Sequence, residues 1–155
     1  MRKHSRGRRA RSVARLHAVQ ALFQMESSGQ TVESIVQEFE AHRFGAVCEG
    51  VEMAEGDSEL FRQVVDAAVN WQAKIDQMTD RALVERWPID RIDPTLRALF
   101  RAAGGELLGC DTPAKVVISE HVDVARAFYG DGREPQFVNA VLDHMAREAR
   151  PAEFA

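Results

Sequence analysis

Guanidinium groups are concentrated at the N-terminal end of the chain. Seven of the 20 basic residues precede Glu26, the first acidic residue, and they are Arg2, Lys3, Arg6, Arg8, Arg9, Arg11 and Arg15. Arginine binds phosphate through a planar pair of N–H donors and stacks on unpaired bases, so this stretch predicts contact with RNA or DNA. A solvated terminus that only improves solubility is the alternative.

The rest of the chain has the opposite charge. Thirteen basic residues and all 24 acidic residues follow Arg15, so this part carries a net charge of −11, although the whole chain carries only −4. One end of the molecule therefore suits a polyanion, and the remainder repels it.

Residue patterns typical of catalysis or metal binding are missing from the sequence. The five histidines and two cysteines have no metal-ligand spacing, and no glycine-rich loop follows a strand. Glu120 and His121, with Asp123 nearby, are typical of a solvated pair, and no nucleophile accompanies them. The sequence therefore predicts no enzyme activity, no cofactor and no metal site.

The predicted first helix would hold the last arginines of this stretch in fixed positions. A flexible basic arm is predicted at residues 1–7, followed by a helix from residue 8 or 9 to about Glu26, before Gly29. The buried face of this helix would consist of Leu16, Val19, Leu22 and Phe23. Arg8, Arg11 and Arg15 project within about 60° of one another, so we expect them to form a basic stripe along one side.

Further helices have recognisable start signals. Thr31 is a predicted N-cap, and Asp93 before a proline is a second. Asp57 is predicted to open a long periodic segment. The helix that Asp93 begins contains Gly104 and Gly105, and each costs about 1 kcal/mol relative to alanine in an exposed helix. We therefore expect a neighbouring helix to approach closely at these glycines.

The whole sequence is predicted to form one all-α domain of 155 residues with about seven helices. It contains no convincing strand, and residues 43–56 are predicted to form a loop. No apolar run approaches the ~20 residues that a membrane span needs, and a signal peptide is not recognisable. Cys48 and Cys110 stand far apart, which suits a reducing compartment and predicts a cytoplasmic protein.

Four segments resemble the successive motifs of NusB, a family of bacterial transcription antitermination factors. They are ARLHAVQALFQ (14–24), LRALFRAAGGELL (96–108), TPAKVVISEHVDVARAF (112–128) and FVNAVLDHMAR (137–147). The resemblance implies two small helical bundles packed side by side, here residues 8–79 and 80–150. It also implies a protein without catalysis that binds boxA-type RNA of ribosomal RNA leaders together with the ribosomal protein NusE. The pair supports assembly of the RNA polymerase elongation complex, and family members are monomers or homodimers.

The resemblance also implies functional residues. Those expected to contact RNA are Arg8, Arg9, Arg11, Arg15, Gln20, Lys115, Phe137 and Asn139. An acidic surface would bind the basic partner protein, with Asp90, Asp93 and Glu106 as its candidates. Asn139 has an alternative role as a cap or interhelix hydrogen bond, and Asp93 has one as a helix cap. Phe23, where the family usually has tyrosine, is predicted to belong to the core.

The chain departs from the family pattern at three positions, and two other functions stay open. The family usually has asparagine, glycine and an aromatic residue where this chain has Ser119, Ala140 and Gly105. A similar bundle forms the N-terminal part of certain ribosomal RNA cytosine methyltransferases, although this chain ends at Ala155 without a cofactor-binding domain. The other alternative is a helical module that binds a basic protein, or a second copy of itself, without RNA.

Overall fold

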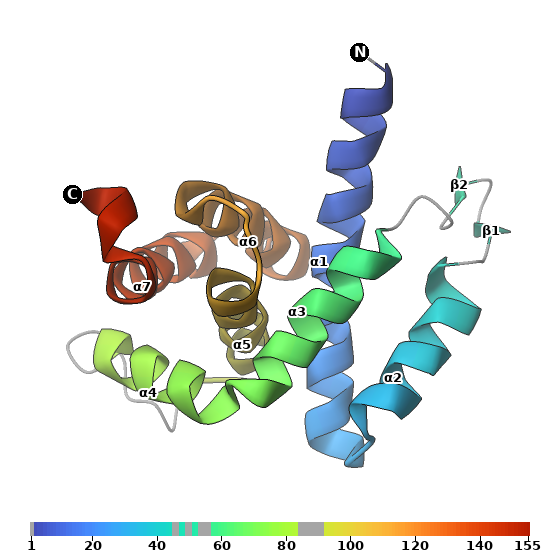
Figure 1. The fold of residues 1–155 in the computed structure, drawn as a ribbon, viewed down its shortest axis with the longest axis horizontal. Helices are drawn as coiled ribbons and strands as arrows, with labels where there is room; N and C mark the ends of the chain where they lie inside the picture. Colours follow the sequence, from blue (N-terminus) through green and yellow to red (C-terminus); the bar gives the residue numbers. More distant parts are fainter. Residues whose placement is uncertain (1, 45–46, 49–50, 53–56, 84–91) are drawn as a thin grey trace.

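The computed structural model describes residues 2–44, 47–48, 51–52, 57–83 and 92–155, with side chains described in 7–42, 57–83 and 92–155. Seven α-helices account for most of this part of the chain (Figure 1): α1 (Arg2–Ser28), α2 (Val32–Phe39), α3 (Ser58–Asn70), α4 (Gln72–Leu83), α5 (Pro94–Gly109), α6 (Ala114–Tyr129) and α7 (Arg133–Ala149). A π-helical turn at Glu40–Phe44 follows α2, and a 3-10 turn at Pro151–Phe154 follows α7. The all-α prediction is confirmed.

The loop predicted at residues 43–56 includes a short hairpin. β1 (Val47–Cys48) and β2 (Val51–Glu52) pair antiparallel, with Val47 opposite Glu52. The prediction that the chain contains no strand is therefore wrong at this point. Each strand is only 2 residues long, which is too short for an alternating pattern to be recognised in the sequence.

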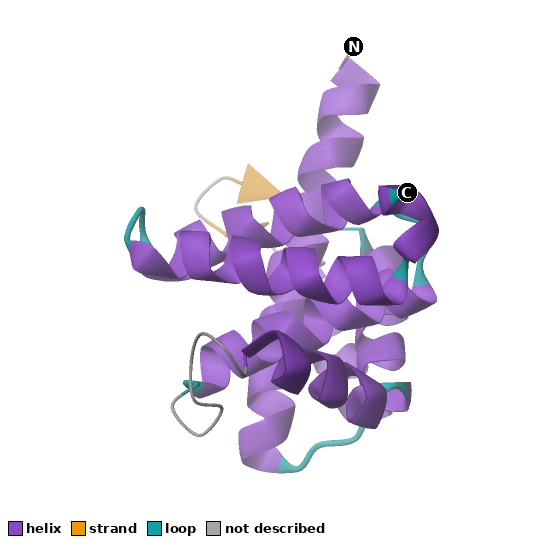
Figure 2. Cartoon of the chain, turned by 90° about the vertical axis from the view of Figure 1, so that its left-hand side faces the viewer, coloured by secondary structure: helices purple, strands orange, loops and turns teal. Residues whose placement is uncertain are grey.

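α1 begins earlier than predicted. It includes residues 2–7, where a flexible arm was expected, because arginine is among the better helix formers and the basic run continues the helix. Figures 1 and 2 show the N-terminal turns of α1 extending beyond the other helices. At its other end the helix stops as predicted before Gly29, whose φ of 72° a residue with a side chain rarely adopts.

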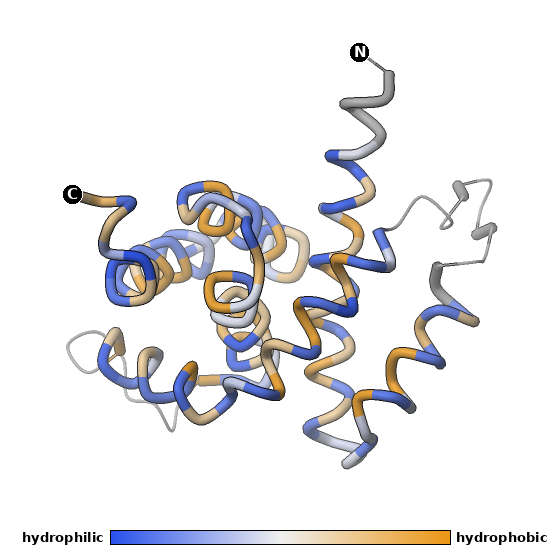
Figure 3. Tube along the Cα trace, in the orientation of Figure 1, coloured by the Kyte–Doolittle hydropathy of each residue, from blue (hydrophilic) through white to orange (hydrophobic). Residues whose placement is uncertain are grey.

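α5 lies at the centre of the fold. It packs against α1 and α3 on one side and against α4, α6 and α7 on the other. Apolar and polar residues are interspersed along the helices (Figure 3), and the buried apolar residues form one contiguous cluster. The boundary predicted between residues 79 and 80 falls inside α4, and α5 joins the helices on both sides of that boundary. A boundary between two bundles at residues 79 and 80 would therefore fall within a single helix.

Two glycines of α5 allow its neighbours to approach closely, as predicted. A Cβ at Gly105 would lie 2.8 Å from the backbone nitrogen of Ala68 and 2.9 Å from the carbonyl oxygen of Val64, both in α3. A Cβ at Gly104 would lie 2.5 Å from Cγ2 of Ile75 in α4. The cost of glycine in the helix is therefore offset by close packing of three helices.

The two predicted N-caps are confirmed, and Asp57, where a helical segment was predicted to open, is a third N-cap. In each, a side-chain oxygen accepts a hydrogen bond from the backbone N–H three residues later, at 3.1 Å for Thr31, 2.9 Å for Asp57 and 2.9 Å for Asp93. The backbone N–H of Asp57 also donates to the carbonyl of Ala10 at 3.0 Å. The start of α3 is thereby fixed against α1.

The turn after α7 holds the connection between α5 and α6. Arg150 donates to the carbonyls of Leu107 at 2.8 Å and Thr112 at 2.5 Å, near a helix end where carbonyls lack helical partners. Glu153 accepts a hydrogen bond from the backbone N–H of Ala114, the first residue of α6, at 2.9 Å. A carboxylate of this chain therefore occupies the N-terminal end of α6, which favours an anion.

Candidate nucleic-acid interface

Three arginines are exposed on the projecting part of α1: Arg8, Arg9 and Arg11. The Arg8 side chain is 77% exposed, and its Nε lies 3.9 Å from Oε1 of Glu120. Within the described side chains, Arg9 and Arg11 have no ion pair. The structure therefore places these three predicted residues where a phosphate can reach them.

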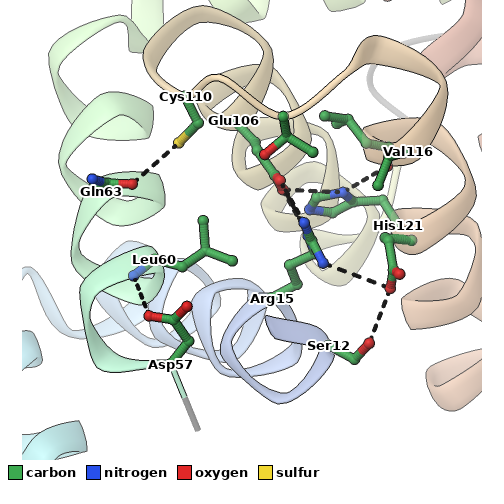
Figure 4. Close-up of polar contacts among 12 residues, drawn as sticks. Ser12, Arg15, Asp57, Leu60, Gln63, Glu106, Cys110, Val116 and His121 are labelled. Atoms are coloured by element: carbon green, nitrogen blue, oxygen red, sulfur yellow. Dashed lines mark hydrogen bonds and ion pairs between the residues drawn. The ribbon is translucent and has the colours of Figure 1, made fainter. Parts of the chain in front are cut away.

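Arg15 does not lie on this surface, so the structure contradicts the prediction that it contacts RNA. It is 2% exposed and pairs with Glu106, which is fully buried in α5 (Figure 4). Its Nε and Nη2 donate to the Glu106 carboxylate at 3.0 and 2.8 Å. Because each side chain satisfies the other inside the core, neither is available to a ligand. For the same reason, the structure contradicts the prediction that Glu106 contacts the partner protein.

The buried pair keeps Glu106 ionised. Burial tends to raise the pKa of its carboxyl, but the hydrogen bond from Arg15 and the neighbouring positive charge outweigh this effect, so the pKa lies below its ordinary value. A carboxylate and a guanidinium without water can persist in a core only when they are hydrogen-bonded to each other. The pair therefore fixes the position of α1 against α5.

His121 lies beside this pair in the core. His121 is fully buried, so the prediction that it is solvated is wrong. Its Nδ1 lies 2.9 Å from the Val117 carbonyl oxygen and 3.8 Å from Oε1 of Glu106. Burial lowers the pKa of His121 more than the nearby carboxylate raises it, so the imidazole is neutral. The short contact to the carbonyl assigns the proton to Nδ1, which donates it there.

The buried imidazole predicts that the fold loses stability in mild acid. His121 binds a proton less readily in the folded chain than in the unfolded chain, whose histidine has its ordinary pKa of 6.5. Stability present above pH ~6.5 is therefore lost as the pH falls toward the folded pKa. Urea midpoints at pH 7.5 and 5.5 would show a smaller loss in His121→Gln than in the parent. His144→Gln, at an exposed position, should show the parent's loss, and equal losses in all three proteins would contradict this assignment.

A first hollow lies beside the C-terminal half of α1. It has a volume of about 310 Å³, and its lining includes Gln20 and Phe23 of α1 and Phe128 of α6. Phe23 is 41% exposed and Phe128 is 38% exposed, so the prediction that Phe23 belongs to the core is wrong. Oε1 of Gln20 is buried without a hydrogen-bond partner among the described residues. The hollow therefore offers two exposed aromatic side chains, whereas the amide oxygen of Gln20 is buried beneath it.

A second hollow follows the first along the same two helices. It has a volume of about 230 Å³ and is lined by Arg9, Ser12, Val13, Leu16, Glu120, Asp123, Val124 and Ala127. On α1 its residues precede those of the first hollow, and on α6 they precede Phe128. We call the two hollows together the α1–α6 groove. It begins at Arg9 and ends at Phe23 and Phe128.

Phe128 is a residue that sequence reasoning missed. It stands at the end of a periodic apolar helix, two residues before Gly130, a position equally typical of a core aromatic. The weak signal that could have identified it is its place in the last turn of α6, where the next turn of chain no longer covers a side chain. The exposure of Phe128 depends on how α1 and α6 pack together, which the sequence of α6 alone does not show.

The other predicted RNA residues lie outside the α1–α6 groove. Lys115 is exposed in the first turn of α6, beside Glu153, which already occupies the helix N-terminus. Asn139 is exposed within α7, too far from its start to cap it. Phe137 is partly buried, with its ring edge-on to Phe100 at a centroid distance of 6.2 Å. None of these three residues is among those that line the two hollows.

The two remaining acidic candidates differ in what the structure describes. Asp90 lies outside the described residues. Asp93 is exposed, and besides capping α5 it accepts a hydrogen bond from Oη of Tyr129 at 2.8 Å. Burial of Tyr129 and this hydrogen bond together raise the pKa of the phenol. Asp93 therefore has a structural role that needs no partner protein.

The described part of the chain contains neither a candidate metal site nor a candidate membrane span. No group of three His, Cys, Asp or Glu side chains there could hold a metal ion. None of the helices described is both long enough and apolar enough to cross a membrane.

Comparison with known proteins places the chain among characterised relatives. The model of the NusB family matches residues 12–147. The chain is 47% identical over 147 residues to the transcription antitermination protein NusB of Maricaulis maris, covering 94% of this chain and 91% of that protein. It is 48% identical over 137 residues to the protein of that name from Brucella abortus, covering 88% and 80%.

Solved structures show the same fold. T. maritima NusB matches with a TM-score of 0.69 and 30% sequence identity, over 96% of each chain. A chain in a crystal structure of the antitermination factors NusB and NusE in complex with dsRNA matches with a TM-score of 0.71 and 23% identity, over 90% of this chain and 98% of that chain. With a family match that spans most of its length and relatives of nearly half-identical sequence, the chain belongs to the NusB family.

Proposed function

We propose that this protein is a transcription antitermination factor that binds boxA-type RNA together with the ribosomal protein NusE. The observation that carries the RNA assignment is the row of exposed arginines on α1 that leads into the α1–α6 groove. The relatives support the antitermination role, because they are named transcription antitermination proteins. The structure of NusB and NusE with dsRNA supports the two partners, because its fold is similar.

The α1–α6 groove suits a single-stranded segment of RNA. Arg8, Arg9 and Arg11 would bind its phosphates, which positions the strand without reading its sequence. Bases turned toward the groove would stack on Phe23 and Phe128, and such stacking is typically worth ~1–3 kcal/mol per base. Gln20, which lines the first hollow, would contact a base edge. Lys115, Phe137 and Asn139 remain proposed contacts for RNA beyond the groove.

The acidic remainder of the chain suits a basic protein partner such as NusE. Asp93 remains a proposed contact because it is exposed. Glu106 is not proposed as a contact, because it is fully buried. Joint binding of RNA and partner would raise the affinity for each by a coupling free energy of ~1–3 kcal/mol. Such an adaptor would act in the cytoplasm, on nascent ribosomal RNA leaders, and would support assembly of the RNA polymerase elongation complex without catalysis.

The proposed function is tested by RNA titration. Dissociation constants would be measured for a boxA oligonucleotide and for a scrambled one of the same composition, with and without NusE. We expect boxA to bind more tightly than the scrambled RNA when NusE is present. Equal affinities would refute the specific role. No binding of either RNA would favour an interaction module that holds only proteins, which a measurement of mass in solution would then identify.

Loss of two exposed arginines should reduce the salt dependence of RNA binding. Replacing Arg9 and Arg11 with alanine removes two phosphate contacts, and each contact contributes ~0.7 to the slope of log K against log salt for a single strand. The slope should therefore become shallower by about 1.4 on both RNAs. Arg62→Ala, which removes an exposed charge of α3, is the control and should leave the slope nearly unchanged. If the double variant kept the parent's slope, the phosphate surface would lie elsewhere.

The methyltransferase alternative predicts a different result. A related bundle that belonged to such an enzyme would support transfer of a labelled methyl group to ribosomal RNA. The relatives of this chain are named transcription antitermination proteins, and the chain covers 91% and 80% of the length of two of them. We therefore expect no incorporation of label above a blank without protein.

A further inference from the structure

A carboxylate lies against the basic side of α1. Glu120 belongs to α6 and is 9% exposed. Its Oε2 accepts a hydrogen bond from Oγ of Ser12 at 3.0 Å and lies 3.7 Å from Nη1 of Arg15. Its Oε1 lies 3.9 Å from Nε of Arg8. Three successive turns of α1 therefore meet one acidic group.

The charge of Glu120 is not required to neutralise Arg15. Glu106 already does so through hydrogen bonds of 3.0 and 2.8 Å, deeper in the core. The negative charge of Glu120 therefore acts outward, on Arg8, whose side chain is 77% exposed. A separation of 3.9 Å is too long for a hydrogen bond. Arg8 is attracted by charge alone, and its N–H donors remain available to a better acceptor.

We propose that Glu120 sets the RNA affinity of the basic surface by competing with phosphate for Arg8. A phosphate near Arg8 would form charge-assisted hydrogen bonds, but it would do so against the attraction of Glu120 for the same guanidinium. Arg9 and Arg11 lack an ion pair among the described side chains, so they bind phosphate without this opposition. Glu120 is thus a positioning residue for Arg8, and the inference rests on the proposed RNA-binding function.

Replacing Glu120 with glutamine should strengthen RNA binding. Glutamine keeps the shape of the side chain and can still accept the hydrogen bond from Ser12. We expect boxA and scrambled RNA to bind about fivefold more tightly, the effect of a unit charge at about 4 Å in water. The factor should be the same for both RNAs because phosphate contacts carry no sequence information. The slope of log K against log salt should steepen by up to ~0.7, as one more contact takes full part.

A double-mutant cycle isolates the contact with Arg8. In an Arg8→Ala background, Glu120→Gln should change RNA affinity by less than twofold, because the competing pair no longer exists. Asp123→Asn is the matched control: it removes the same charge one turn along α6 and lines the same hollow, but it pairs with Arg126. It should tighten binding less than Glu120→Gln does, and equally in both backgrounds.

Several results would overturn the inference. Unchanged or weaker binding by a folded Glu120→Gln variant would do so, as would a fivefold gain that persists without Arg8. A gain restricted to boxA would show that Glu120 reads a base instead. If Glu120→Gln did not fold, the salt slopes of Arg8→Ala and Arg11→Ala would decide, because Arg8 should contribute less than half as much as Arg11, and equal contributions would refute the competition. Failure of the parent protein to bind any RNA would refute the proposed function as well.

Discussion

Replacing Gly105 with alanine should destabilise the fold by about 2 kcal/mol, although alanine is the better helix former. The new Cβ would lie 2.8 Å from the nitrogen of Ala68 and 2.9 Å from the oxygen of Val64. Both atoms belong to the backbone of α3, so no side-chain rotation can relieve the contact. α3 and α5 would have to separate, and a close-packed interface between them would lose contacts along its length.

Thermal and urea unfolding of Gly105→Ala would measure this loss. For a domain of about this size, 2 kcal/mol lowers the melting temperature by roughly 4–8 °C. Gly7→Ala is a matched control, because it adds the same methyl group to a helix where the nearest atom is the flexible end of Arg11, at 3.2 Å. We expect that control to melt at or above the parent's temperature. Equal melting of both variants would show that α3 and α5 can separate without cost.

The same contact explains one departure from the family pattern. An aromatic residue is usual at the position of Gly105 in the family that the sequence resembles. In this chain the backbone of α3 occupies the space such a ring would need, since even a methyl group meets Ala68 and Val64. The glycine is therefore coupled to a closer approach of α3, and replacing it with tyrosine should prevent this packing.

Replacing Arg15 with methionine should cost about 3 kcal/mol or more, because it would leave a buried carboxylate without its partner. Glu106 is fully buried and its Oε2 accepts a 2.8 Å hydrogen bond from Arg15. Without Arg15, the neutral His121 offers no compensating charge. Glu106 would then avoid the penalty by binding a proton, so the pKa of its carboxyl would rise above the ordinary value of 4.5.

The pH dependence of this variant distinguishes a lost charge partner from a lost packing contact. A carboxyl whose folded pKa exceeds its unfolded pKa gains stability as the pH falls. The deficit of Arg15→Met relative to the parent should therefore shrink between pH 7.5 and 5, as measured by urea unfolding. The double variant Arg15→Met with Glu106→Met should recover much of the loss, because two apolar side chains can replace a buried ion pair. A constant deficit across this pH range would contradict the ion-pair account.

RNA binding by the same variant tests whether Arg15 contacts RNA or only serves the core. If Arg15 serves the core, folded Arg15→Met should keep the salt slope of the parent on both RNAs. A slope reduced as much as in Arg11→Ala would instead return Arg15 to the phosphate surface. The comparison separates two arginines that stand one turn apart on α1.

Local sequence signals identified most of the helices and the basic end of the chain. Thr31, Asp57 and Asp93 act as N-caps because a cap depends on a side chain and a backbone N–H only three residues away. The end of α1 at Gly29 has the same local origin. The concentration of arginine before Glu26 is a property of composition, and no packing can change it. Motifs in the correct order were also enough to suggest the family.

Contacts between distant segments could not be obtained this way. The pairing of β1 with β2 was missed because each strand is too short to have a period. The boundary predicted between residues 79 and 80 falls inside α4, and α5 packs against helices on both sides of it. A pattern along one helix indicates that a face is buried, but it does not specify which helix covers it or where that cover ends.

Arg15 and Phe23 show this limit within α1 itself. By sequence alone, Arg15 was assigned to a basic stripe and Phe23 to an apolar face. At a rotation of 100° per residue, however, Arg15 projects between Leu22 and Val19, on that same apolar face. The tertiary structure reverses both: α5 supplies Glu106 to a buried Arg15, while Phe23 remains 41% exposed at the edge of a hollow. The sequence by itself determined the helices, their caps and the charge of the N-terminal end, because these depend on near neighbours. Only the packing of α5 and α6 against α1 decided which arginines face solvent, because that depends on residues about 90 positions away in the chain.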